Sequence, residues 1–418
     1  MAASWWTTAV PNPPQRDRYR AQIDKMITRF NGRVAPFPQV ADLADTVFLH
    51  STQHVLARDD ANLPQVLGAL NLTPASVDRP VAGLARVRLP NGVSAPQAVQ
   101  MVAAAAGSRL AVFDRVVHIA SASACPATEP DETTSPSPVP AGPGTPRDPG
   151  REVHVAVIDT GLPPRGNGET MSLAQWPWMS HVTGEPEDSR HAGHYKGHGM
   201  FVAGVLAAMA PTATIKVHPF LFTNGGQLES DLVGLIAEAA SENPRPDIIS
   251  MSAGTSLHGP AIGVDTDPLL GFDALGQHLA QQGTLLVCAA GNDAGPGPFE
   301  PASLGWPVAV GALNADGSLA GYSNRGPWVD VYARGTDVVN AFKNGAYVYE
   351  EPPRAGGPAL VVNNWLASWT GTSFATPIVA GAIANRMAAH NETAAVAWAA
   401  LKLAADQRAG AGGLPTIP

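Results

Sequence analysis

The chain has 418 residues, long enough for a large buried core and for two or more domains. It carries 26 Lys and Arg residues against 35 Asp and Glu residues, a formal net charge of −9, so its charge gives no basis for binding nucleic acid. No segment reaches the ~18 consecutive apolar residues that a membrane-spanning helix needs, so we expect no membrane partner.

The N-terminal segment, residues 1–39, is predicted to be a helical arm. Apolar residues recur at helical spacing between Gln15 and Phe30, and we expect this amphipathic helix to pack on the domain beside it. The segment begins without the basic and apolar regions of a signal peptide. The chain's two cysteines, Cys125 and Cys288, are too few for a disulfide framework. We therefore expect a cytoplasmic protein, with secretion by an unrecognised route as the alternative.

Residues 40–120 alternate between short strands and helices. Two helices on one side of a small antiparallel sheet would explain a compact α+β unit of about eighty residues. Asp60 and Ser94 stand in the positions of helix N-caps. The strand patterns cover 46–51, 84–89 and 109–119, and the helix patterns cover 61–72 and 94–106.

Residues 121–150 are rich in Pro, Gly, Ser and Thr and offer few apolar side chains to a core. We predict an extended linker here. A cut near its start could separate the two halves of the chain, and the neighbourhood from Ala120 to Ala124 is where we would look for it. The alternative is that the linker only spaces two domains.

From residue 151 to residue 410, uniformly apolar strands alternate with helices. Strands of this kind are buried on both faces, which indicates an α/β fold with a doubly wound parallel sheet and helices on both faces. Functional residues are expected at the carboxyl ends of its strands. Residues 411–418 form a tail. The predicted strands cover 153–158, 214–217, 247–251, 284–289 and 308–312, and the predicted helices cover 199–208, 228–242 and 269–282.

Three stretches of this region carry groups suited to nucleophilic chemistry. An apolar strand ends at Asp159, His198 opens a helical pattern, and Ser373 follows a Gly-Thr pair and precedes a third apolar run. A serine at a helix N-terminus lies where free N–H groups and the helix dipole favour negative charge. Its hydroxyl still needs a base to take its proton and a group to orient that base. Ser373, His198 and Asp159 are therefore candidates for nucleophile, base and orienting carboxylate.

The stretches Asp-Thr-Gly at 159–161, Gly-His-Gly at 197–199 and Gly-Thr-Ser at 371–373 resemble those of the subtilisin-like serine peptidases, whose triad follows the order Asp, His, Ser. The resemblance covers roughly residues 152–400 and implies the subtilisin-like fold. It implies a serine endopeptidase that cuts peptide or protein substrates through an acyl-enzyme and requires no cofactor. The alternative is an autoinhibited or non-cleaving protein of the same fold that binds peptides.

The resemblance also assigns roles to residues that follow two of the predicted strands. Asn292 matches the asparagine whose amide stabilises the oxyanion. One segment would pair with the substrate backbone as an added strand, and a second would complete the pocket for the residue before the scissile bond. Their small side chains predict a pocket for a medium or large apolar side chain. The two walls are Ser250, Ser252, Ala253 and Gly254 on one side and Ala289, Ala290 and Gly291 on the other.

By its position, the 40–120 unit resembles the ferredoxin-like prodomains of this family, which assist folding and occupy the active-site cleft. The resemblance implies a zymogen whose own N-terminal domain is its intramolecular inhibitor. The alternative is an accessory domain without an inhibitory role. Met200 and Phe374 stand where the family commonly has other residues, and we interpret both as packing positions.

Two groups of residues raise the question of a metal. Asp265, Asp267 and Asp273 could bind calcium, although solvated loop carboxylates explain them equally well. Three histidines lie between His191 and His198, but glycines interrupt any helix there, and a zinc ion would have to take the proposed base. We therefore assign no metal ligand.

Overall fold

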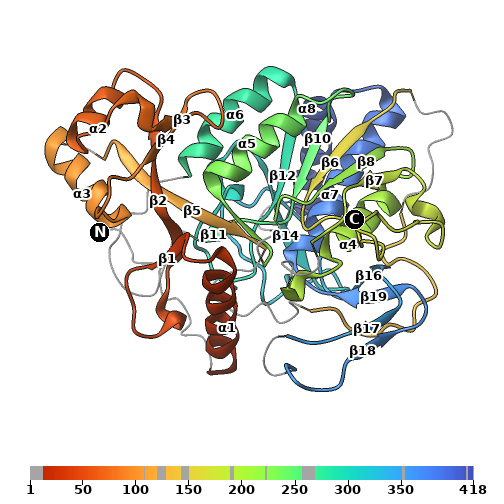
Figure 1. Ribbon diagram of the computed structural model, residues 1–418. Helices are drawn as coiled ribbons and strands as arrows, with labels where there is room; N and C mark the ends of the chain where they lie inside the picture. The colour runs from red at the N-terminus through yellow and green to blue at the C-terminus, as the bar shows by residue number, and fades with distance from the viewer. Residues whose placement is uncertain are drawn as a thin grey trace.

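The computed structural model of the protein describes residues 13–107, 109–119, 129–142, 150–188, 193–221, 224–256, 269–350, 354–410 and 413–417. Within these ranges the chain forms an N-terminal unit built on an antiparallel sheet and a larger unit built on a parallel sheet. The two units lie side by side (Figure 1).

The larger unit is organised around a seven-stranded sheet in which neighbouring strands run parallel. The α/β fold with a parallel sheet is thereby confirmed. Each of the five predicted strands appears within one residue of its expected ends, while the two strands at the edges were not predicted. The strand order is β15 (Val331–Arg334), β14 (Val308–Leu313), β12 (Leu285–Ala289), β10 (Ile248–Met251), β6 (His154–Ile158), β8 (Thr214–His218) and β7 (Val182–Gly184).

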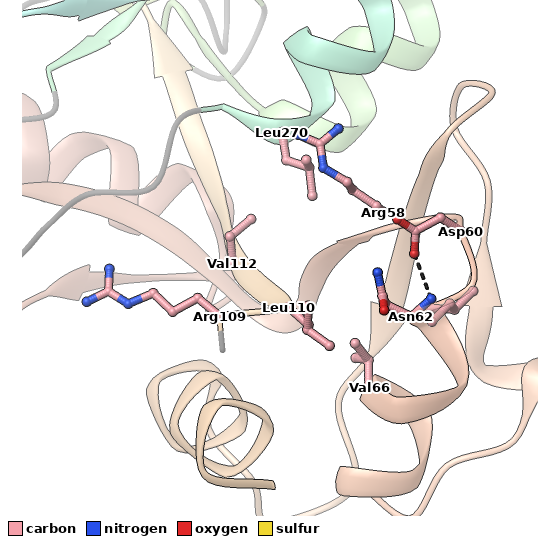
Figure 2. Close-up of a pocket in the computed structure, with 9 residues that line it drawn as sticks. Arg58, Asp60, Asn62, Val66, Arg109, Leu110, Val112 and Leu270 are labelled. Atoms are coloured by element: carbon pink, nitrogen blue, oxygen red, sulfur yellow. Dashed lines mark hydrogen bonds between the residues drawn. The ribbon is translucent and has the colours of Figure 1, made fainter. Parts of the chain in front are cut away.

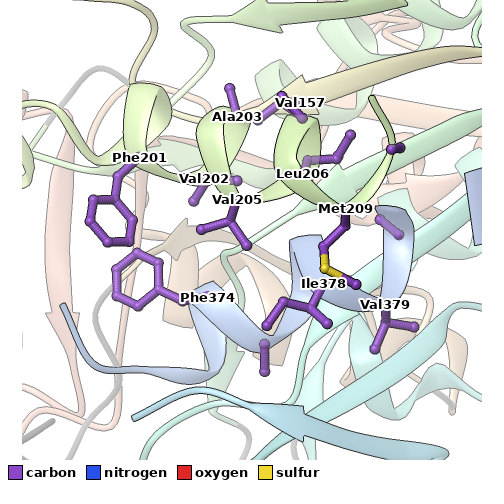
Figure 3. Close-up of a cluster of buried hydrophobic side chains, with 14 of the residues drawn as sticks. Val157, Phe201, Val202, Ala203, Val205, Leu206, Met209, Phe374, Ile378 and Val379 are labelled. Atoms are coloured by element: carbon purple, nitrogen blue, oxygen red, sulfur yellow. The ribbon is translucent and has the colours of Figure 1, made fainter. Parts of the chain in front are cut away.

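Helices cover both faces of this sheet: α4 (His198–Met209), α5 (Glu229–Ala240), α6 (Leu270–Gln282), α7 (Thr372–His390) and α8 (Ala394–Ala409). Alternate residues of a strand point to opposite faces. Accordingly, Val155 and Val157 of β6 pack in one cluster with α4 and α7, whereas Ala156 and Ile158 pack in another with α5 and α6. Figure 3 shows α4 lying along α7 in the first cluster. The uniform apolar character of the strands thus reflects burial on both faces.

The N-terminal unit has helices on one face of an antiparallel sheet. The helices are α2 (Leu63–Ala69) and α3 (Ala95–Ala106), and they share a core with Val55 and Val87. The other face lies toward the larger unit (Figure 1). A ferredoxin-like topology stays a prediction. The sheet order is β3 (Val77–Asp78), β4 (Leu84–Arg88), β2 (Phe48–Arg58), β5 (Ala111–His118) and β9 (Gly226–Leu228), with β1 (Val34–Phe37) paired to β2.

Of the two helix N-caps predicted in this unit, one is confirmed and the other is wrong. Ser94 is the N-cap of α3 and forms a capping box with Gln97, as its sequence position indicates. The cap assigned to Asp60 is wrong, because α2 begins after Asn62 and the Asp60 carboxylate accepts the Asn62 N–H at 2.8 Å. Asp60 therefore stabilises the turn before the helix.

The N-terminal arm is a helix, α1 (Pro13–Phe30), which packs on the N-terminal sheet. Its apolar face contributes Tyr19, Ile23, Met26 and Phe30 to a cluster with residues of β1, β2, β5 and β9. The helix ends beside the hairpin of β17 (Gly345–Tyr347) and β18 (Leu360–Val362), as Figure 1 shows. The arm thus packs on its neighbouring domain as expected.

The described part of the linker, residues 129–142, is extended but docked on the larger unit. Asp131 pairs with Ser368 and Val139 with Val339 as isolated antiparallel bridges. Glu129 is buried, and its carboxylate accepts the Glu350 N–H at 2.7 Å. Its composition predicted the lack of regular structure but not these contacts.

Short strand pairs complete the larger unit on the side of the N-terminal unit and below the sheet. The pairs are β11 (Thr255–Ser256) with β13 (Phe299–Glu300), β16 (Val338–Ala341) with β19 (Leu366–Trp369), and β17 with β18.

Among the described residues, no helix is both long and apolar enough to cross a membrane.

Candidate active site

Asp159 and His198 form a buried pair at the carboxyl end of β6. His198 Nδ1 lies 2.8 Å and 2.9 Å from the two carboxylate oxygens of Asp159, and both side chains are buried. A proton on Nδ1 satisfies the carboxylate and leaves Nε2 as the basic nitrogen. The N–H of Thr160 also donates to Asp159, at 2.8 Å. The two residues that the sequence placed in one site are therefore in contact.

The glycine after His198 is required by the close approach of α4 to the loop after β6. A β-carbon added to Gly199 would lie 2.8 Å from the nitrogen of Gly161. The Gly199 N–H donates to Thr160 Oγ1 at 3.1 Å, so the helix start and this loop are also hydrogen-bonded. This contact fixes the position of His198 relative to Asp159.

The His198 ring lies among aromatic side chains, one of which is Phe374. Its centroid is 5.3 Å from that of Phe374 and 5.3 Å from that of Trp369. Phe374 is buried and follows Ser373 in the first turn of α7, so this contact brings His198 alongside the turn that carries the serine. Met200 is also buried in the same core. The interpretation of Met200 and Phe374 as packing positions is confirmed.

Ser373 lies in the first turn of α7, and Pro377 explains one of its contacts. In a regular helix the Ser373 carbonyl would accept the N–H of residue 377, but proline has none. Instead, Ser252 Oγ donates to the Ser373 carbonyl at 2.9 Å. The predicted substrate segment is thereby joined to the helix that bears the serine. Because α7 begins at Thr372, Ser373 lies at a helix N-terminus, as its sequence position indicates.

Asn292 lies next to the same turn. Its Oδ1 accepts the N–H of Thr372 at 2.8 Å and the Thr372 hydroxyl at 2.9 Å. Because Oδ1 accepts these bonds, Nδ2 is the donor end of the amide. The structure thus brings Asn292 to the turn that contains Ser373.

Glu187 is a buried acid that the sequence patterns did not single out. Its Oε2 accepts the Gly197 N–H at 2.8 Å and lies 3.5 Å from Thr160 Oγ1. Burial raises the pKa of Glu187 to about 7. It therefore links the loops that carry Asp159 and His198. It lies in an irregular loop, so neither strand nor helix periodicity could have identified it.

The first predicted wall divides into two parts. Ser250 lies within β10, in register with Val157 and Val287 of the neighbouring strands, so it belongs to the central sheet. Ser252, Ala253 and Gly254 come after the strand. Gly254 exchanges backbone hydrogen bonds of 2.9 Å and 3.0 Å with His118 at the end of β5.

The side chain of Phe299 lies against the second predicted wall. Ala290 packs with Leu313 on the far side, whereas Gly291 faces Phe299. A β-carbon added to Gly291 would lie 2.8 Å from Phe299 Cγ, and one added to Gly254 would lie 2.8 Å from Phe299 Cδ1. The Phe299 ring therefore spans the space between the two walls. Sequence reasoning missed Phe299, because strand β13 has only two residues.

No group of three or more His, Cys, Asp or Glu side chains in the described part of the chain is placed to hold a metal. Asp273 forms an ion pair with Arg58 at 3.0 Å. The possible calcium ligands Asp265 and Asp267 lie outside the described residues, as does His191.

Comparison with known proteins gives consistent matches. The model of the subtilase family matches residues 150–413. The thermophilic serine proteinase of Bacillus sp. strain AK1 is 30% identical over 225 residues, which are 51% of this chain and 48% of that protein. The intracellular serine protease of Paenibacillus polymyxa is 31% identical over 252 residues, 56% of this chain and 66% of that protein.

The crystal structure of fervidolysin from Fervidobacterium pennivorans, described as a keratinolytic enzyme related to subtilisin, aligns with a TM-score of 0.58 at 19% identity. The alignment covers 88% of this chain and 60% of that one, and at this identity it shows the fold. The chain thus spans less than two thirds of each of these relatives. The family model covers more than half of the chain, and the protein belongs to the subtilase family.

Proposed function

We propose that the protein is a serine endopeptidase with Ser373 as nucleophile, His198 as general base and acid, and Asp159 as the orienting carboxylate. The observation that carries the proposal is the buried Asp159–His198 pair, whose imidazole packs on Phe374, the residue after Ser373. Its substrates are peptides or proteins.

The chemistry follows from these positions. Ser373 Oγ attacks the peptide carbonyl carbon while its proton passes to His198 Nε2, and that proton then goes to the leaving amine as the C–N bond breaks. Water attacks the resulting acyl-enzyme by the same route and restores the serine hydroxyl. The Asn292 amide and the Ser373 N–H would stabilise the oxyanion; such a donor contributes about 100- to 1000-fold in turnover, a figure from subtilisin itself. None of these steps uses a cofactor.

The N-terminal unit is the proposed intramolecular inhibitor. The end of β5 lies between two segments of the larger unit: His118 forms an isolated bridge with Gly254 on one side, and Val116, Val117 and His118 pair with β9 on the other. An extended segment held in this way would occupy the position that we propose for a substrate backbone. The expected cut between Ala120 and Ala124 lies outside the described residues and directly follows this strand.

A second contact supports the same role. The α1 residue Lys25 donates to the Glu350 carboxylate at 3.1 Å and to its carbonyl at 2.9 Å. Lys196, two residues before His198, contacts the other Glu350 oxygen at 3.1 Å. The N-terminal unit is therefore attached to the larger unit at both β5 and α1.

A fluorophosphonate probe, which reacts with activated serines, tests the enzymatic proposal. We expect the full chain to be labelled at Ser373 and the Ser373→Ala variant to remain unlabelled. If a variant without residues 1–150 is folded by circular dichroism and yet remains unlabelled, the proposal is contradicted and the peptide-binding alternative is favoured.

A further inference from the structure

Phe299 occupies a position where it can decide which side chain precedes the scissile bond. It is 2% exposed, and its ring lies between Gly254 and Gly291, one glycine from each wall of the candidate pocket. Both glycines lack the β-carbon that would otherwise meet the ring. The ring and the two backbones are therefore in direct contact.

The strand that carries Phe299 is fixed to the substrate segment. β13 pairs with β11, so that Phe299 is in register with Ser256 and Glu300 with Thr255, directly after Gly254. The Glu300 carboxylate also accepts the Leu269 N–H at 2.6 Å. Because backbone pairing and a buried side-chain bond hold β13, we expect the ring to stay in place when a peptide binds.

The register of β5 defines which residue of a bound peptide meets this ring. A bound peptide that follows the path of β5 has one residue opposite Gly254, where His118 lies now. Because the pairing is antiparallel, the peptide residue two positions later lies opposite Ser252. Ser252 is bonded to the Ser373 carbonyl, so a peptide residue at that position lies next to the nucleophile. Its side chain would enter the space between the walls, where Phe299 lies.

We infer that Phe299 makes this pocket shallow and that the substrates carry a small residue, Gly, Ala or Ser, immediately before the cut. This inference rests on the proposed peptidase function and defines its substrate class. It replaces the expectation of a medium or large apolar side chain, which considered the small wall residues alone. Packed interiors do not yield space for an added ring without strain.

The chain's own sequence is consistent with this selectivity. The stretch that follows β5, in which we expect the maturation cut, reads Ala-Ser-Ala-Ser-Ala from Ala120 to Ala124. Every bond within it follows a small residue. A self-processing enzyme with a shallow pocket requires such a sequence at this place.

The test is a series of peptide p-nitroanilides that differ only in the last residue, which is Gly, Ala, Ser, Leu or Phe. Each rate is divided by the amount of Ser373 that the fluorophosphonate probe labels after the full chain has been incubated to allow self-processing. We expect the Ala substrate to exceed the Phe substrate by at least about 100-fold in kcat/KM, in the range that pocket size can supply. Comparable rates for Ala and Phe would overturn the inference.

Two variants sharpen this result. Phe299→Ala opens the pocket, so we expect the Phe and Leu substrates to gain at least about tenfold relative to Ala. Phe299→Leu is the matched control, because it keeps an apolar side chain in the space and should retain the preference for small residues. An unchanged preference in a folded Phe299→Ala variant would also overturn the inference. Loss of probe labelling in the wild type would instead contradict the proposed function.

Discussion

The parallel sheet and the contact between the two units, here called the seam, are both buried. They differ in the side chains that they bury. In the sheet, residues such as Val157 and Ile158 pack in clusters of apolar side chains from the helices and the neighbouring strands. In the seam, β5 buries Asp114, Arg115 and His118. The seam also contains a hollow of ≈ 180 Å³ between β5, α2 and Leu270 of α6 (Figure 2). Apolar packing on both faces stabilises the sheet over a wide range of pH, whereas buried titratable groups and imperfect packing make the contact between the units weaker and sensitive to pH.

The largest expected effect comes from breaking the catalytic pair inside the larger unit. Asp159→Asn keeps the shape but stabilises the wrong tautomer of His198, so we expect kcat to fall by about 10⁴-fold. Thermal unfolding should remain close to that of wild type. The measurement is the rate of peptide hydrolysis, compared between wild-type and Asp159→Asn proteins that both lack residues 1–150, so that neither depends on self-processing. Activity within tenfold of wild type would show that Asp159 does not orient the base.

A smaller effect is expected at the seam from Asp114, whose carboxylate accepts the N–H and hydroxyl of Ser230 in α5. Asp231 and Arg86 also face it. Burial raises the pKa of Asp114 to about 7, from an ordinary value near ~4. Between these values the released unit loses a proton that the docked unit keeps, so docking weakens as pH rises from ~4 to about 7 and then levels off, by up to about tenfold per pH unit.

Asp114→Asn removes one titrating group from the contact, so the number of protons linked to docking between pH ~4 and about 7 should fall by one. A slope should remain, because burial also raises the pKa values of Glu229 and Glu300. His118 acts in the opposite direction: burial lowers its pKa to about 4, so docking weakens as pH falls below ~6.5. The measurement is the fraction of processed N-terminal fragment that co-elutes with the larger unit between pH 5 and pH 8. Identical profiles for variant and wild type would contradict the role of Asp114.

The smallest effect is expected at the partly exposed contact between α1 and Glu350. Exposed ion pairs contribute roughly 0–1 kcal/mol, so Lys25→Met should speed release of the N-terminal fragment only about two- to fivefold. Lys216→Met is the control, since Lys216 pairs with Glu242 within the larger unit at 2.7 Å. Equal release rates for the two variants would remove α1 from the inhibitory contact.

The sequence predicted the central part of the fold because its signals are local. Five apolar runs became parallel strands, and the motifs around Asp159 and His198 lie at the ends of such elements. The edge strands β7 and β15 are also short, but unlike the predicted strands they are not uniformly apolar: β7 contains Thr183 and Gly184, and β15 ends at Arg334. A search for apolar runs therefore passes over them.

The parts that escaped prediction depend on contacts between distant residues. Phe299 closes the pocket only because β13 pairs with β11, and Glu187 reaches Gly197 through an irregular loop. The linker appeared to lack partners, yet Glu129 and Asp131 bind a hairpin more than 200 residues later, as the Tyr347 and Arg354 contacts show. Such contacts leave no pattern in the local sequence.

The most direct test of the central claim, that Ser373 cuts the chain's own peptide bond beyond β5, is the intact mass of the purified protein after incubation. We expect wild type to yield two fragments separated within residues 120–124 and the Ser373→Ala variant to keep its full mass. An identical cut in both proteins would show that another protease makes it. No cut in a wild type that the probe labels at Ser373 would contradict self-processing.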